Sequence, residues 1–359
     1  MKAFLLLEDG TRFYGEPFGE IKGTIGEVVF STSMTGYQEG LTDPSFYGQI
    51  LVLTYPLVGN VGFNNYDYES NRISVKGLVI KELCDVPSNW AKRGSLDEFM
   101  KKYGIAGLQG VDTRALTLKI REESVMRGMI CLDEPTEEQL EQLRSYKIEK
   151  PIYKVTIKEK MVLDGERGGK KIAVMDFGIK ENMVRELHGR GHTMTLYPAW
   201  TTAEEILADK PDGILLSNGP GDPKDNPDII ANIKKLIGKK PIMGICMGHQ
   251  LLALANGMDS YKLKYGHRGA NQPVKDLETG RVYISSQNHG YVIREPEAGS
   301  GIEVTFRNVN DGTIEGLSYK DHPSFSVQFH PEACPGPMDT QFLFDKFERM
   351  MEGKTNAKK

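Results

Sequence analysis

Several features typical of other protein classes are missing from this sequence. No stretch of the 359 residues approaches 18 consecutive apolar residues, so we expect no membrane-spanning segment. The formal net charge of −4 gives no basic surface of the kind that binds nucleic acid. The apolar opening segment, residues 1–7, is too short for a secretory signal, and we interpret it as a first strand. These absences favour a globular protein that acts away from membranes and nucleic acids.

Cysteine and histidine are both scarce, and their positions are informative. The chain has only four cysteines, which are far apart and include no Cys-x-x-Cys pair: Cys84, Cys131, Cys246 and Cys334. Such spacing predicts no disulfide framework and is typical of a reducing cytoplasm, where we expect this protein. All seven histidines lie between His188 and His330. Any histidine-based acid–base chemistry is therefore expected in the second half of the chain.

The chain length and the change of pattern along it predict two domains. In residues 1–153 short apolar runs alternate with turn residues, which predicts a smaller, mixed α+β domain. Residues 154–170 are rich in charge and glycine and are interpreted as a linker. Residues 171–359 alternate short strands with helical stretches, which predicts an α/β domain with a doubly wound, mostly parallel sheet. The expected strands are 172–175, 193–196, 213–216 and 241–245, and the expected helices are 180–188, 202–208, 227–237 and 248–255.

The segment around Cys246 has the pattern of a nucleophile elbow. Gly-x-Cys-x-Gly lies between a predicted strand and a predicted helix, and Gly244 and Gly248 leave room for a sharp turn. The free N–H groups at the start of that helix favour a thiolate, which is the reactive form of cysteine. A buried cysteine flanked by packing glycines is the alternative, and the position between strand and helix favours the nucleophile.

His330 is the candidate general base. In residues 324–330 polar and apolar residues alternate, which predicts a strand with His330 at its end and Glu332 two residues further on. A thiol nucleophile needs a base to take its proton, and the base needs a carboxylate that fixes its tautomer. Cys246, His330 and Glu332 can fill these three catalytic roles.

Two other interpretations concern the same region. A metal site made by His322, His330 and Cys334 is the weaker one, because the spacing matches no common zinc pattern, and we predict no metal site. Cys334 could act as a second reactive thiol. The proline-rich segment 334–337 favours a turn in which Cys334 is an inert filler.

The loop after the predicted strand 213–216 is a candidate oxyanion site. It reads Ser-Asn-Gly-Pro-Gly-Asp-Pro over residues 217–223. Acyl transfer needs backbone N–H donors aimed at the oxyanion that develops during the reaction, and glycine lets the backbone approach closely. We predict the N–H groups of Gly219 and Met247 as the two donors. A breaker-rich loop without function is the alternative.

Four motifs, in this order, resemble those of the class I, or triad, glutamine amidotransferases: LSNGPGDP, GICMGHQ, QNHGY and QFHPE. The resemblance covers the second half of the chain, residues 171–351. It implies hydrolysis of L-glutamine through a γ-glutamyl thioester, with ammonia passed to a partner site. It also implies a set of glutamine-binding residues in this half: Gly219, Gly221, Met247, Gln250, Asn288, Gly290 and Tyr291.

Four segments of the first half resemble the small subunits of carbamoyl phosphate synthase: 30–39, 41–45, 54–60 and 110–117. This resemblance implies that Ser33 reaches the glutamine site from a partner-contacting N-terminal domain. It also implies a heterodimer with a large subunit that makes carbamoyl phosphate from bicarbonate and ATP. The chain has no Gly-x-x-x-x-Gly-Lys-Ser/Thr loop. We therefore expect ATP and magnesium on the large subunit and no cofactor on this chain.

Two other functions stay open at this point. One is the glutaminase component of another synthase, for example of GMP or anthranilate synthesis, although the N-terminal domain argues against it. The other is a binding or scaffold protein with a silent triad, which the intact Cys246, His330 and Glu332 argue against. The sequence also leaves open whether the product enters pyrimidine or arginine synthesis.

Overall fold

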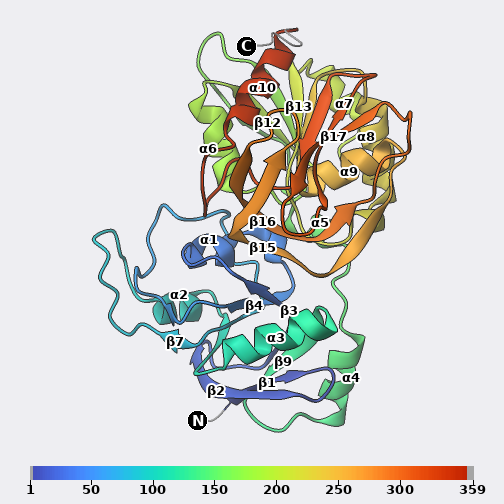
Figure 1. The fold of residues 1–359 in the computed structure, drawn as a ribbon. Coiled ribbons are helices and arrows are strands. Elements are labelled where there is room, and N and C mark those ends of the chain that lie inside the picture. Colours follow the sequence, from blue (N-terminus) through green and yellow to red (C-terminus); the bar gives the residue numbers. More distant parts are fainter. Residues whose placement is uncertain (1–2, 354–359) are drawn as a thin grey trace. The chain divides into compact units, whose positions relative to one another are not determined.

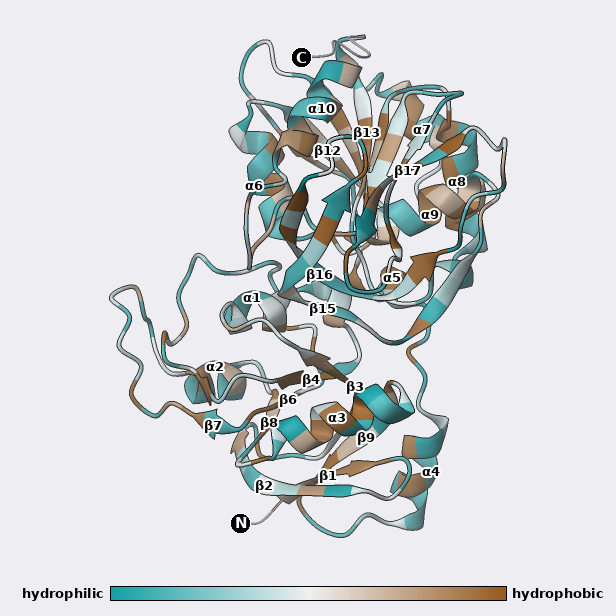
Figure 2. Cartoon of the chain, in the orientation of Figure 1, coloured by the Kyte–Doolittle hydropathy of each residue, from teal (hydrophilic) through white to brown (hydrophobic). Residues whose placement is uncertain are grey.

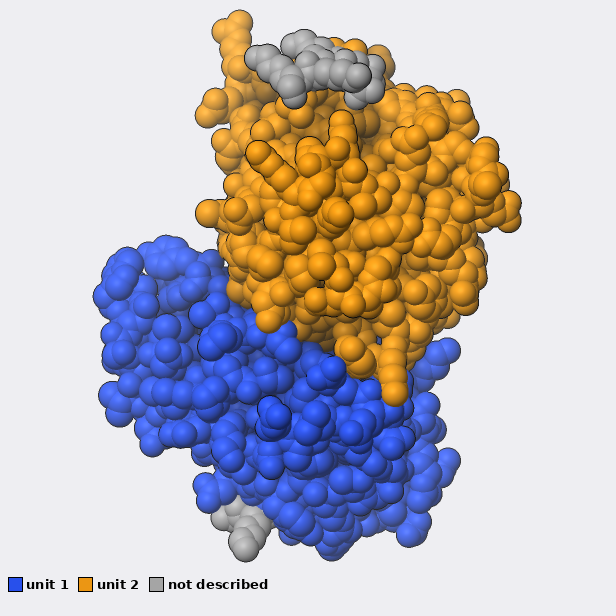
Figure 3. Space-filling view, viewed as in Figure 1, with its two compact units in different colours: residues 1–149 blue, residues 150–359 orange. Residues whose placement is uncertain are grey.

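The computed structural model describes residues 3–353 and divides into two compact units, residues 1–149 and residues 150–359 (Figure 3). The division lies close to the predicted end of the N-terminal domain at residue 153. Across residues 3–353, none of the helices combines the length and the apolar character that crossing a bilayer requires.

Unit 1 is built around a closed barrel with the strand order β1-β2-β8-β6-β4-β3-β9 (Figure 1). The seven strands are β1 Ala3–Leu7, β2 Arg12–Gly19, β3 Thr24–Ser31, β4 Gln49–Leu53, β6 Gly77–Val79, β8 Ala106–Gln109 and β9 Met126–Cys131. Three neighbouring pairs, β3–β4, β4–β6 and β6–β8, are parallel, and the other pairs are antiparallel. β5 Leu57–Val58 and β7 Glu82–Leu83 form a separate two-stranded sheet. The predicted mixed α+β character of this half is therefore confirmed.

The helices of unit 1 are short and carry clear start signals. They are α1 Tyr37–Thr42, the 3₁₀ helix η1 Pro44–Phe46, α2 Leu96–Lys102, α3 Thr113–Glu123 and α4 Glu137–Ser145. A capping box is present at α2, because the Ser95 hydroxyl accepts from the Glu98 N–H and the Glu98 carboxylate accepts from the Ser95 N–H. Figure 2 shows hydrophobic residues along β4, in which Gln49 and the four hydrophobic residues after it are all buried.

Unit 2 contains one ten-stranded sheet with the order β10-β12-β11-β13-β14-β19-β18-β17-β15-β16. Its strands are β10 Met161–Leu163, β11 Lys171–Asp176, β12 Thr193–Pro198, β13 Gly213–Leu216, β14 Ile242–Ile245, β15 Ser260–Asp276, β16 Val282–Ile293, β17 Ile302–Asn308, β18 Ile314–Tyr319 and β19 Ser324–Val327. The five strands from β12 to β19 in this order pair in parallel, and every other pair is antiparallel. The prediction of a mostly parallel sheet is thus correct for the centre and wrong for the sheet as a whole.

Helices cover both faces of the parallel centre, as a doubly wound sheet requires. The helical elements of unit 2 are α5 Pro151–Val155, α6 Glu181–Gly189, α7 Ala203–Ala208, η2 Pro223–Asp225, α8 Pro227–Leu236, α9 Met247–Ala255 and α10 Phe342–Met351. All four helices expected between residues 180 and 255 are confirmed. Successive side chains of β11 point to opposite faces of the sheet and therefore belong to two different cores. Met175 packs in the core that includes α7, α8 and α9, and Val174 packs in the core that includes α6 and α10.

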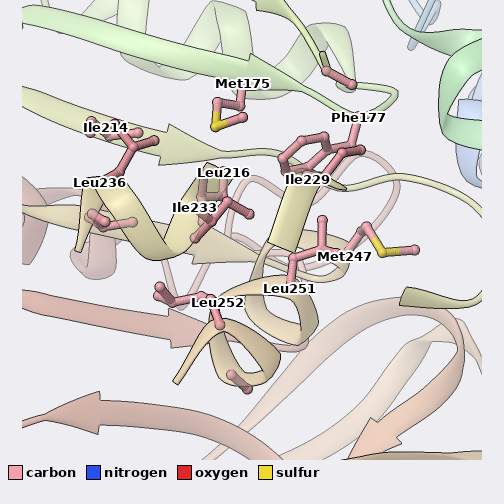
Figure 4. Close-up of a cluster of buried hydrophobic side chains, with 14 of the residues drawn as sticks. Met175, Phe177, Ile214, Leu216, Ile229, Ile233, Leu236, Met247, Leu251 and Leu252 are labelled. Atoms are coloured by element: carbon pink, nitrogen blue, oxygen red, sulfur yellow. The ribbon is translucent and has the colours of Figure 1, made fainter. Parts of the chain in front are cut away.

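The core on the α8–α9 side fixes the helix that follows Cys246. Leu251 and Leu252 of α9 pack with Ile233 of α8 and with Leu216 of β13 (Figure 4). Leu251 is fully buried, which stabilises the fold by about 1.5–3 kcal/mol relative to an exposed position. The start of α9 is therefore held at the carboxyl end of the parallel strands, where sites of such sheets lie.

The expected linker, residues 154–170, belongs to unit 2. Its β10 pairs antiparallel with β12 at the edge of the large sheet. In addition, the N–H of Ile157 donates to the Asp176 carboxylate at the end of β11, over 2.7 Å. The linker prediction differs from the structure because a three-residue edge strand flanked by charges and glycines has no clear pattern in the sequence.

Candidate active site

Cys246 occupies a strained turn between β14 and α9. Its backbone has φ 53° and ψ −104°, a combination that costs on the order of 1–3 kcal/mol for a residue other than glycine. A Cβ on Gly248 would lie 2.1 Å from the Leu216 carbonyl oxygen, and one on Gly244 would lie 2.7 Å from the Gly248 carbonyl oxygen. The predicted elbow is confirmed, and its two glycines are required by backbone contact.

The Cys246 thiol lies between the start of α9 and strand β16. The residue is 1 % exposed, and its Sγ donates to the carbonyl oxygen of Asn288 over 3.7 Å. Because Met247 is the first residue of α9, its N–H has no acceptor within the helix. The positive end of the helix dipole therefore lies at the sulfur and stabilises negative charge there.

His330 and Glu332 form a buried pair beyond the end of β19. His330 Nδ1 lies 2.7 Å from Glu332 Oε1, and the residues are 2 % and 0 % exposed. The His330 N–H donates to the Ser286 carbonyl of β16, over 2.9 Å, which fixes the backbone. Among the described residues His330 Nε2 has no hydrogen-bond partner that meets ordinary geometry. This nitrogen is thus available for a proton from the nucleophile.

The electrostatics of His330 fit a base paired with a thiol. Burial disfavours the charged ring, but the Glu332 charge and the neighbouring Cys246 thiol outweigh it and raise the pKa of His330 above its ordinary value. Burial also acts on Glu332, where it favours the neutral acid. The charges of Lys180 and His330 act more strongly together and lower the pKa of the Glu332 carboxyl. The pair is therefore set up to keep Glu332 ionised and to stabilise the imidazolium that His330 becomes when it takes the thiol proton.

Lys180 is a site residue that the sequence reasoning missed. Its Nζ lies 3.2 Å from Glu332 Oε1, the oxygen that also contacts His330, and it donates to the Ala333 carbonyl as well. The Asn182 side chain donates to the Glu332 carbonyl. Lys180 follows β11 at the carboxyl edge of the sheet, where a lysine close to the predicted site could have been noticed. Sequence spacing alone does not reveal its partner 152 residues away.

The loop 217–223 is tied to its neighbours by specific contacts. The Ser217 carbonyl accepts from the Gly248 N–H over 2.9 Å, and the Ser217 hydroxyl accepts from the Phe177 N–H over 2.9 Å. A Cβ on Gly219 would lie 2.3 Å from the Phe177 carbonyl oxygen, so this backbone approach requires glycine. Gly221 is also held closely, with φ +94° and with Pro151 2.4 Å from its would-be Cβ. The roles of Gly219 and Met247 as oxyanion donors stay predictions.

The structure brings most of the predicted glutamine-binding residues to one place. Asn288, Gly290 and Tyr291 lie on β16, and Asn288 contacts Cys246. The Gln250 amide on α9 donates to the Tyr291 carbonyl over 2.8 Å and to Gln328 Oε1 over 3.0 Å. Ser33 lies in unit 1, buried, and its N–H donates to the Ser31 hydroxyl. The assignment of all these residues to glutamine stays a prediction.

The weaker metal interpretation does not match the contacts of His322. Its ring nitrogens lie 2.8 Å from Ser324 Oγ and 3.1 Å from Asn256 Oδ1, and neither of these atoms belongs to the proposed set. Within residues 3–353, one group has the spacing of metal ligands, and it is a different one: His267, His289 and Glu315, with ligand atoms within 4.8 Å of one another. The sequence reasoning did not identify this group.

The fold and the elbow triad define the class of the protein, and comparison with known families agrees with them. The model of the class-I glutamine amidotransferases matches residues 173–350. The model of the carbamoyl-phosphate synthase small chain, CPSase domain, matches residues 5–130. The chain is thus a class I glutamine amidotransferase with a second, more specific domain ahead of the glutaminase part.

Curated relatives make the identification more specific. A carbamoyl phosphate synthase small chain from Listeria monocytogenes serotype 4b (strain F2365) is 50 % identical over 356 residues, which are 98 % of each chain. A carbamoyl phosphate synthase pyrimidine-specific small chain from Bacillus subtilis (strain 168) is 51 % identical over 354 residues, 98 % of this chain and 96 % of that one. The chain belongs to the family of carbamoyl phosphate synthase small chains, the glutamine-hydrolysing subunits. The alternatives of GMP or anthranilate synthesis are therefore wrong.

Proposed function

We propose that this chain hydrolyses L-glutamine at Cys246 and delivers the ammonia to a separate large subunit, which makes carbamoyl phosphate from bicarbonate and ATP. The observation that carries the proposal is the arrangement of Cys246 beside His330, whose other ring nitrogen lies 2.7 Å from Glu332. A nucleophile, its base and the carboxylate that orients the base are the minimum set for thiol-based acyl transfer.

The first half of the reaction forms a thioester. His330 Nε2 takes the thiol proton, and Sγ attacks the carboxamide carbon of glutamine. The N–H groups of Gly219 and Met247 stabilise the oxyanion of the tetrahedral intermediate. His330 then protonates the leaving nitrogen, the C–N bond breaks, and ammonia departs. Glu332, held by Lys180, stabilises the imidazolium that forms between these two proton transfers.

The second half regenerates the enzyme. Water gives a proton to His330 Nε2 and attacks the thioester carbon. The C–S bond breaks, glutamate is released, and the sulfur recovers its proton from His330. Side chains and backbone groups of this chain supply every step, so the proposal needs no cofactor on it. ATP and magnesium are assigned to the large subunit, and the heterodimer to the cytoplasm.

Substitution of the nucleophile in the assembled heterodimer tests this function. Cys246→Ser is expected to abolish glutamine-dependent carbamoyl phosphate formation and to leave ammonia-dependent formation intact. Cys131→Ser, which changes a buried thiol in unit 1, is the matched control and should retain both activities. Glutamine-dependent synthesis at the wild-type rate in Cys246→Ser would show that Cys246 is not the nucleophile.

A further inference from the structure

A buried group of ionisable side chains lies on and beside β16, and the mechanism above does not use it. We call it the His267 cluster, made of His267 on β15, His289 on β16, Asp311 in the turn before β18, and Glu315 on β18. His267, His289 and Glu315 are 7 %, 5 % and 0 % exposed, and Asp311 lies at the partly exposed edge. Such a concentration of ionisable groups inside a fold is costly unless the charges are paired.

His267 has a carboxylate within ion-pair distance of each ring nitrogen. Its Nε2 lies 2.8 Å from Asp311 Oδ2, and its Nδ1 lies 3.5 Å from Glu315 Oε1. Asn308 donates to the same Glu315 oxygen over 3.2 Å. Burial opposes a charged ring, but the two carboxylates outweigh it and raise the pKa of His267 to about 9. At neutral pH His267 is therefore an imidazolium between two carboxyl groups.

His289, in contrast, is held as a neutral ring. Its ring meets that of His267 edge to face, with 5.0 Å between ring centres and an angle of 84°. Burial and, after it, the charge of His267 lower the pKa of His289 well below its ordinary value. Its Nδ1 lies 2.9 Å from the Tyr291 carbonyl oxygen, and its Nε2 lies 3.0 Å from Gln287 Oε1. A neutral ring carries one N–H group, and when this is on Nδ1 it donates a hydrogen bond to the Tyr291 carbonyl.

The Tyr291 carbonyl links the His267 cluster to the active site. It also accepts from Gln250, on the first turns of the helix that begins after Cys246. Asn288, next to His289 in sequence, presents its carbonyl to the Cys246 sulfur. Successive side chains of a strand point to opposite faces, so the ring of His289 supports the backbone whose neighbours face the nucleophile.

The backbone ladder alone holds this segment weakly. The pairing of β15 with β16 shifts register between Lys262 and His267 and again between Gly269 and Gln272. Three paired positions remain between the two irregularities, and His267 faces His289 in the first of them. Interrupted ladders leave a short segment more dependent on its side chains.

We propose that His267, together with Asp311 and Glu315, is a positioning residue for glutamine binding. It keeps His289 neutral and in place, and His289 in turn orients the β16 segment that carries Asn288 and Tyr291. The inference rests on the proposed function of that segment. A metal ion held by His267, His289 and Glu315 is the competing assignment, and the ion pairs of His267 and the nearby Arg268 charge argue against a further cation.

Charge removal in the heterodimer tests the proposal. His267→Gln keeps an amide that can donate to Asp311. However, it leaves the buried Glu315 without its counter-charge, and the unpaired negative charge of Glu315 then favours protonation of His289. We expect the KM for glutamine to rise about tenfold, because small displacements of binding groups have large effects, with kcat and ammonia-dependent synthesis unchanged. The neutral double variant His267→Gln/Glu315→Gln should return to within about threefold of the wild-type KM, since no unpaired buried carboxylate remains.

Two further variants keep the test decisive. Asp311→Asn, at the partly exposed edge, removes one counter-charge without opening the core, and it should raise the KM in the same direction by a smaller factor. His322→Gln removes a histidine outside the cluster and should leave the KM unchanged. Complex formation and circular dichroism check folding of each variant.

Three results would overturn the proposal. The first is a KM for glutamine that equals the wild-type value in both His267→Gln and Asp311→Asn. The second is a His267→Gln/Glu315→Gln variant that is as impaired as His267→Gln. The third is one tightly bound metal ion per chain, found by elemental analysis of the wild type and absent from His267→Gln. Failure of the proposed function is distinguishable, because it would appear as glutamine-dependent synthesis in Cys246→Ser.

Discussion

Lys180 Nζ lies 3.2 Å from Glu332 Oε1, and both side chains are almost completely buried, at 4 % and 0 % exposed. The same carboxylate oxygen contacts His330 Nδ1. The carboxylate of the triad is therefore shared between the base that it orients and a lysine from a different strand end. This places a fourth side chain in direct support of the catalytic arrangement.

Lys180→Met should be strongly disruptive. It keeps the length of the side chain but leaves Glu332 without its main counter-charge, and breaking one partner of a buried pair costs about 3–5 kcal/mol. We expect a lower free energy of unfolding in urea and a large loss of glutamine hydrolysis. Lys235→Met, which breaks an exposed pair with Glu204, is the control and should retain activity. Wild-type hydrolysis by Lys180→Met would show that the lysine is dispensable.

The parts that the sequence predicted are those with local signals. The elbow at Cys246 is defined by two nearby glycines and by its position between strand and helix, and the helices 181–189 and 227–236 have clear apolar patterns. His330 and Glu332 are two residues apart and follow an alternating strand. Each of these features depends on contacts within a few residues, which composition and spacing can reveal.

The parts that the sequence missed depend on distant pairing. The barrel of unit 1 closes through strands as far apart as β1 and β9, and the antiparallel half of the large sheet contains the irregular 17-residue strand β15. Irregular register interrupts the alternation by which a strand is normally predicted. Lys180 and His267 acquire their partners only through the folded sheet, so no local pattern identifies them.

Gly248→Ala should prevent a native elbow. The added Cβ would lie 2.1 Å from the Leu216 carbonyl oxygen, which is backbone and cannot move without shifting β13. We expect a lower melting temperature and loss of glutaminase activity together. Gly189→Ala, at the end of α6, is the matched control, because nothing lies within 4 Å of its added Cβ. It should be neutral or should stabilise the protein by up to about 1 kcal/mol, and equal damage by both substitutions would contradict this interpretation.

His249 should make the protein less stable in acid. Burial lowers its pKa to about 3, against about 6.5 in the unfolded chain, and its Nδ1 lies 2.8 Å from Ser326 Oγ. The folded state binds fewer protons at this ring, so its contribution is fully present above pH 6.5 and is lost as the pH decreases toward 3. His249→Asn keeps a polar atom near Ser326 and removes the titration.

The comparison is made between pH 6.5 and pH 5. Wild type should lose about 2 kcal/mol more than His249→Asn over this interval, because each pH unit per proton amounts to about 1.4 kcal/mol. Urea unfolding of both proteins at the two pH values measures the difference. Parallel losses in wild type and variant would show that His249 is already protonated in the fold.

A glutamine-analogue electrophile should label one cysteine of the four. Cys246 lies at the start of α9 and next to His330, the base that can take its proton. Cys131 is the internal contrast, because burial raises its pKa to about 11 and keeps it a thiol. Peptide mapping after labelling should therefore locate the modification at Cys246, and excess glutamine should slow it. Labelling at Cys334, which glutamine also slows, would identify that thiol as the nucleophile and reject the mechanism proposed above.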